Sequence, residues 1–140
     1  MADDDGRAKL IWRLSQSGLG TTLTAAGNSG SYTASNINAV TAIDLRRVTD
    51  LGLMVYVGGI AGTGTPTITV TLGIYDGAGN LFPAVLTTTG ITATGGKAVY
   101  AGLFSGPGAQ IVFPEWGQVA WTVSGTNPSF SQVEISLYGR

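Results

Sequence analysis

Glycine and proline interrupt nearly every stretch of this chain that is long enough to form a helix. The 140 residues include 22 glycines and 5 prolines, and Gly-rich runs at 76–80, 94–96 and 105–108 separate short apolar segments. Gly and Pro both disfavour helix interiors, and many short strands divided by such turns are typical of a sandwich or barrel. We therefore predict an all-β fold, a single-domain antiparallel β-sandwich of jelly-roll-like or immunoglobulin-like type.

Alternation of apolar and polar residues places the clearest strands. In the segment 51–57, Leu51, Leu53, Val55 and Val57 share one side. Such alternation predicts half-buried antiparallel strands, apolar inward and hydroxyl-bearing outward. The other clear segments are 9–14, 67–75, 119–123 and 133–137, and weaker strand candidates are 21–25, 40–45, 85–89, 97–104 and 109–113.

Two details refine these strands. Phe130 is out of phase with Val133, Ile135 and Leu137, so we expect a bulge near Gln132 that returns Phe130 to the apolar face. The polar segment 27–38, rich in Ser, Asn and Gly, predicts a long loop or a disordered excursion.

One motif occurs twice, at residues 57–68 and 121–130. Each copy has an apolar run, a turn that contains Gly-Thr and Pro, and a second run that begins with Thr or Ser. Gly permits positive φ and Pro fixes φ, so this pattern predicts a turn between two strands. The sequence thus predicts two similar hairpins.

Composition limits the class of protein. Net charge is −1, charged residues make up 11% of the chain, and the basic residues form no long cluster, so nucleic-acid binding is not expected. The chain contains no membrane-length apolar run and no basic, apolar N-terminal signal, which predicts a protein made soluble in the cytoplasm, without membrane contact. The absence of Cys leaves the redox compartment undetermined. The low charge favours packing into an assembly, although Thr is also common at exposed strand positions for its β-propensity.

Catalytic chemistry has few candidates here. The chain has no His and no Cys, which removes the commonest general base, the thiolate nucleophile and the usual transition-metal ligands. Lys97 follows two glycines in a context that predicts a turn, and 76–80 predicts a tight hairpin turn in place of a calcium loop. We expect no enzyme activity, no catalytic residue, no cofactor and no metal site.

The segments 62–71, 76–77 and 119–130 together resemble small β-rich structural proteins of tailed bacteriophages, of the capsid decoration and minor capsid type. The resemblance covers roughly residues 48–137. It implies a virion protein that binds and stabilises the head shell, with the major capsid protein or another virion protein as partner. It also implies a homo-oligomer, with a trimer favoured. A tail or fibre component, or a carbohydrate-binding or receptor-binding sandwich module, is the alternative.

Four residues are candidates for the interface. Residues 1–14 form an N-terminal arm or edge strand ahead of a sandwich domain at 15–140, and Leu10, Ile11 and Trp12 would anchor the arm on a neighbouring subunit. Alternatively, Trp12 completes the core of its own sandwich. Trp116 is expected in a loop, either as a binding aromatic or as a lid on the sandwich. A glycan would stack on exposed aromatic rings, with Trp116, Tyr32, Tyr56 and Tyr100 as candidates.

Overall fold

The computed structural model describes residues 7–15, 20–33, 41–102 and 115–140. Strands, and no helix, form the regular structure of these residues, which confirms the prediction of a single-domain antiparallel all-β fold. The expected strand at 109–113 lies outside the described residues. The strands are β1 (Lys9–Arg13), β2 (Thr21–Leu23), β3 (Gly27–Asn28), β4 (Ile43–Asp44), β5 (Asp50–Val57), β6 (Gly59–Tyr75), β7 (Leu81–Thr87), β8 (Gly95–Gly102) and β9 (Trp116–Gly139).

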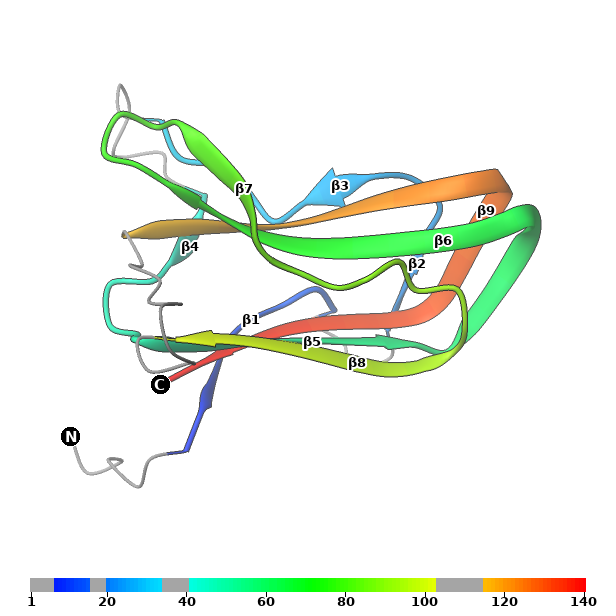
Figure 1. The fold of residues 1–140 in the computed structure, drawn as a ribbon, viewed down its shortest axis with the longest axis horizontal. Helices are drawn as coiled ribbons and strands as arrows, with labels where there is room; N and C mark the ends of the chain where they lie inside the picture. Colours follow the sequence, from blue (N-terminus) through cyan, green and yellow to red (C-terminus); the bar gives the residue numbers. More distant parts are fainter. Residues whose placement is uncertain (1–6, 16–19, 34–40, 103–114) are drawn as a thin grey trace.

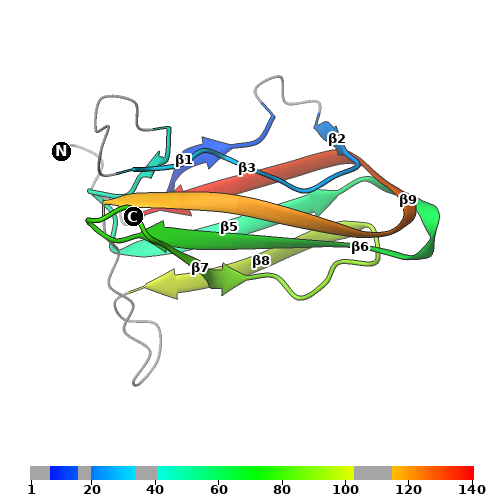
Figure 2. The same cartoon turned by 90° about the horizontal axis from the view of Figure 1, so that it is seen from above.

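The strands form two layers that share β9 (Figure 1). One layer, the β5 sheet, has the order β8-β5-β9-β1 and uses the C-terminal half of β9. The other, the β6 sheet, pairs β7 with β6 and β6 with residues 116–131 of β9, and the short strands β2, β3 and β4 also pair with β9. Figure 2 shows the two layers from above. A single strand therefore joins both sheets.

The core lies between the inward faces of the two sheets. Leu51, Leu53, Val55 and Val57 are all buried, as the alternation predicts. Their counterparts in the β6 sheet also alternate inward. The fully buried residues there and in β9 include Ile68, Val70, Leu72, Val119, Phe130, Val133, Ile135 and Leu137.

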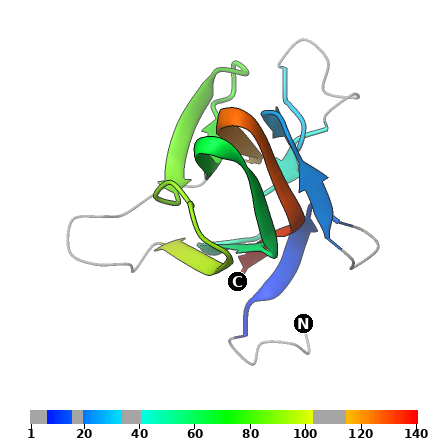
Figure 3. The same cartoon turned by 90° about the vertical axis from the view of Figure 1, so that its right-hand side faces the viewer.

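The predicted hairpins at the repeated motif are wrong. The turn of each copy lies inside one continuous strand, because β6 runs for 17 residues from Gly59 and β9 for 24 residues from Trp116. Both strands bend where they pass from one sheet to the other, at the end of the molecule that faces the viewer in Figure 3. Strands that switch sheets in this way turn the corner through bulges or bends, so the motif bends a strand and does not end it.

The two bends contact each other. Thr63 pairs with Thr126, and the register of β6 against β9 shifts on both sides of Thr63. The backbone has positive φ at Gly62 (114°) and Thr65 (53°) in β6, and at Gly125 (116°) in β9. The repeated motif is therefore a matched pair of bends, built from residues that tolerate positive φ or are held there by the opposite strand.

A bulge in β1 explains its unusual apolar pattern. The register of β1 against β9 shifts between Leu10, opposite Tyr138, and Trp12, opposite Leu137. Ile11 and Trp12 are half-buried and both pack against the core, whereas Leu10 points outward and is 46% exposed. An extra residue in a bulge lets two consecutive side chains face the same way. The structure thus matches the alternative in which Trp12 completes its own sandwich.

The expected bulge near Gln132 is confirmed. Gln132 has a φ of 50°, and the register of β2 against β9 shifts between the pairs Thr21 with Val133 and Leu23 with Phe130. Phe130 is fully buried in the same core as Val133. The bulge therefore restores Phe130 to the inward face.

Three local predictions have mixed outcomes. The hairpin turn at 76–80 is confirmed, since one carboxylate oxygen of Asp76 accepts hydrogen bonds from the backbone N–H groups of Ala78 and Asn80. The turn expected around Lys97 is wrong, because 95–97 belong to β8. The loop expected at 27–38 contains the short strand β3, and its last residues lie outside the described ranges.

The paired bends predict a sensitive position at Gly125. A Cβ atom there would lie 3.0 Å from the Cα of Pro66, and the φ of 116° is unfavourable for a residue with a side chain. We expect Gly125→Ala to lower the free energy of unfolding by about 1–3 kcal/mol, measured by chemical denaturation. Gly77→Ala is the control, because a Cβ there meets no atom within 4 Å. Equal stability of the two variants would contradict the role of the bends.

Candidate docking face

The outward face of the β5 sheet carries a different chemistry from the outward face of the β6 sheet. On β6 and β9, the outward positions hold Thr69 opposite Thr122 and Thr67 opposite Ser124. On β5 and β9, Met54 lies opposite Ser136, and Tyr56 lies opposite Glu134. The positions on β6 and β9 are thus rich in hydroxyl groups, whereas β5 exposes Met54 and Tyr56; large apolar side chains are also exposed on β7, at Leu81 and Phe82. We call the outward face of the β5 sheet the docking face.

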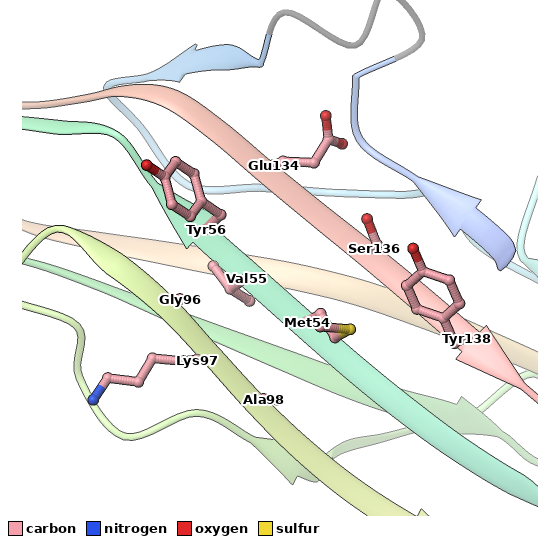
Figure 4. A pocket seen from close by; sticks show the side chains of 9 residues that line it. All are labelled: Met54, Val55, Tyr56, Gly96, Lys97, Ala98, Glu134, Ser136 and Tyr138. Atoms are coloured by element: carbon pink, nitrogen blue, oxygen red, sulfur yellow. The ribbon is translucent and has the colours of Figure 1, made fainter. Parts of the chain in front are cut away.

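Large apolar side chains are exposed on the docking face. Leu10 and Met54 are each 46% exposed, and Tyr56 is 53% exposed. A hollow of about 330 Å³ lies among them (Figure 4), with Tyr56 and Tyr138 on either side of Met54. The residues that line the hollow are Met54, Val55, Tyr56, Gly96, Lys97, Ala98, Glu134, Ser136 and Tyr138. An exposed apolar patch of this kind marks an interaction site more often than a random surface does.

Two ion pairs bound this apolar patch. At one end Arg13 Nη2 lies 3.3 Å from Glu134 Oε2, and the backbone N–H of Ser15 donates to Glu134 Oε1 at 3.1 Å. At the other end Arg140 Nε lies 3.2 Å from Asp50 Oδ2. An apolar centre with a polar rim is the usual anatomy of a protein interface. Because each carboxylate has a basic partner, the rim carries little net charge.

The edges of both sheets are poorly suited to strand addition. Edge strand β7 contains Pro83 and a register shift against β6, and edge strand β1 contains the bulge described above. In edge strand β8, exposed Lys97 lies opposite the buried Val55, at an inward-facing position. Proline, bulges and inward-pointing lysines are devices that prevent edge pairing. Partners are therefore expected on a face of the sandwich, not on an edge.

Trp116 does not lie in a loop as predicted. It is the first residue of β9 and pairs with Tyr75 of β6 and Asp44 of β4. Its ring stacks on Tyr32, with 6.0 Å between ring centroids, and the Arg46 guanidinium carbon lies 5.1 Å from its centroid. These contacts match the alternative in which Trp116 covers the end of the sandwich.

Asp44 anchors the arginine in this aromatic cluster. Arg46 Nε and Nη2 donate to the two Asp44 carboxylate oxygens at 3.0 and 2.7 Å, and the Arg46 backbone N–H donates at 2.9 Å. The side-chain hydrogen bonds from Arg46 are the main reason why the pKa of Asp44 falls from 3.8 to about 2. The pair fixes the guanidinium beside Trp116.

The four candidate interface residues are divided among three places. Leu10 lies on the docking face, opposite Tyr138, whereas Ile11 and Trp12 pack on the core. Trp116 belongs to the aromatic cluster. Sequence reasoning named Tyr56 as a candidate aromatic but missed Met54 and Tyr138. The sequence does contain a signal for Met54. The inward positions of β5 are apolar, and its outward positions Met54 and Tyr56 also carry large apolar side chains.

Among the described residues, no group of three or more His, Cys, Asp or Glu residues is placed to hold a metal ion. Within the same ranges, no helix is long and apolar enough to span a bilayer.

No family model and no curated protein matches the chain.

The lowered pKa of Asp44 predicts a pH dependence. The ionised carboxylate favours the folded state, so this stabilisation is present above pH 3.8 and is lost as the pH falls towards 2. Wild type should therefore be more stable than Asp44→Asn at pH 6, by a small margin because the pair is exposed, and the two should converge near pH 2. Denaturation at both pH values checks this. A difference that grows on acidification would contradict the role of the Arg46 pair.

Proposed function

We propose that this chain is a non-enzymatic structural protein of a virion, most simply a decoration protein of a phage head shell. The proposal combines the resemblance to phage structural proteins with the properties of the docking face. A decoration protein stabilises a shell by burying its own surface against the shell and against its neighbours. Binding to the assembled lattice, but not to free subunits, favours assembly by mass action.

The observation that carries the proposal is the exposed apolar patch around Met54 and Tyr56. Both side chains are about half exposed on a rigid sheet. A patch with an apolar centre and neutralised ends suits burial against another protein. Such a role requires rigidity and surface complementarity, and it requires no reaction chemistry.

The other functions predicted from the sequence have less support. A glycan stacks on a free aromatic ring face, and the ring of Trp116 already contacts Tyr32 and Arg46, which leaves Tyr56, 53% exposed, as the best-placed glycan candidate. A tail or fibre component would use the same docking chemistry, but it would form rings or filaments where a head protein binds a closed shell. The form of the assembly therefore separates the two virion roles.

The proposal is tested by adding the purified protein to head shells of the encoding phage that were assembled without it. We expect the protein to sediment with the shells and to give ordered density at lattice symmetry positions in electron micrographs. Free capsid subunits are the control and should not retain it. Bare shells after incubation would exclude the decoration role, and binding to tails alone would favour the tail alternative.

A further inference from the structure

We infer that the partner of the docking face is a second copy of this chain, packed face to face about a two-fold axis. The inference rests on the proposed function, because it names a partner for the same patch. Its basis is that the docking face is self-complementary in both shape and charge.

Shape complementarity follows from the order of large and small side chains. Along β5 the outward positions are Gly52 and Met54, and beside them on β9 lie Tyr138 and Ser136. Met54 and Tyr138 thus each have a small residue next to them, both along the strand and across to the neighbouring strand, whereas Tyr56 lies beside Met54 and opposite Glu134. A two-fold axis that runs across the strands between these rows places Met54 over Gly52 of the second copy, and Tyr138 over Ser136. The hollow beside Ser136 (Figure 4) would then receive the Tyr138 ring of the other molecule.

Charge complementarity follows from the ends of the same strands. Glu134 and Arg140 lie on the same side of β9, towards opposite ends of the apolar patch, and within one molecule they pair with Arg13 and Asp50. The same axis brings Glu134 of one copy opposite Arg140 of the other, and this occurs twice. Opposite charges at the rim fix the register of such an interface, while the apolar centre supplies most of the affinity.

The packing is also compatible with the general geometry of sheets. Two sheets stack face to face with their strand directions within about 30° of each other. A two-fold axis uses the same patch on both molecules and therefore closes the assembly at two copies. The blunted edges of β1, β7 and β8 leave faces as the route to association. The result is a dimer, in place of the trimer that the resemblance implies.

The first test measures the mass of the purified wild-type protein by sedimentation velocity over a wide concentration series, without shells. We expect a monomer–dimer equilibrium, and Met54→Lys should weaken it roughly tenfold or more, because a charge would be buried in the apolar centre. Phe82→Lys is the matched control, since Phe82 is 54% exposed but lies on β7 in the other sheet. Denaturation of both variants checks that each is folded.

A second test locates the contact with single cysteines, since the chain has none of its own. Ser136→Cys should cross-link into dimers with a short bis-maleimide, whereas Thr122→Cys, on the opposite outward face, should not.

Three outcomes would overturn the inference. They are a wild-type monomer at every concentration, a wild-type trimer, and equal effects of Met54→Lys and Phe82→Lys. A wild-type monomer that still binds shells, and loses that binding on Met54→Lys, would assign the face to the shell and leave the proposed function standing.

Discussion

The pairing of one strand with nearly all the others is the constraint on which this structure depends. β9 has hydrogen-bonded partners in both layers, among them β1 at the start of the chain and β6 in its middle. It can serve both layers only because it bends at the Gly125 motif, where the matching bend of β6 lies against it. Without these bends the two sheets would have no common strand, and their inward faces would not meet.

The docking face depends on the same arrangement. Met54 belongs to β5 and Ser136 to β9, and they become neighbours only through the pairing of these strands. The buried Val55 and Ile135 alternate with them and hold the two strands on the core. The residues of the patch belong to paired strands and not to loops, so its large and small side chains keep a fixed spacing. A self-complementary surface requires such a spacing.

Local pattern predicted much of this fold, and its failures have a physical cause. Alternation identifies β5 and the buried face of β9, because every second residue of these segments is apolar and buried, as at Leu53 and Ile135. The bends were mistaken for hairpin turns, since Gly and Pro have the same local signature in both. What separates the two is the strand that pairs across the motif, and that strand lies far along the chain. The docking face was missed for the same reason, as its members come from distant segments. The outward position of Leu10 was hidden by a bulge that only pairing with β9 creates.

The place of β9 in the chain also has a consequence for biosynthesis. During translation, β1 to β8 emerge from the ribosome before the strand that joins them, and contacts between distant segments form late because closing long loops is entropically costly. The pairing of β5 with β9, and the part of the docking face that involves Tyr138, cannot be completed until residue 139 has been made. A nascent chain that still lacks β9 therefore also lacks half of the proposed docking face, so association through that face can begin only after β9 has been made.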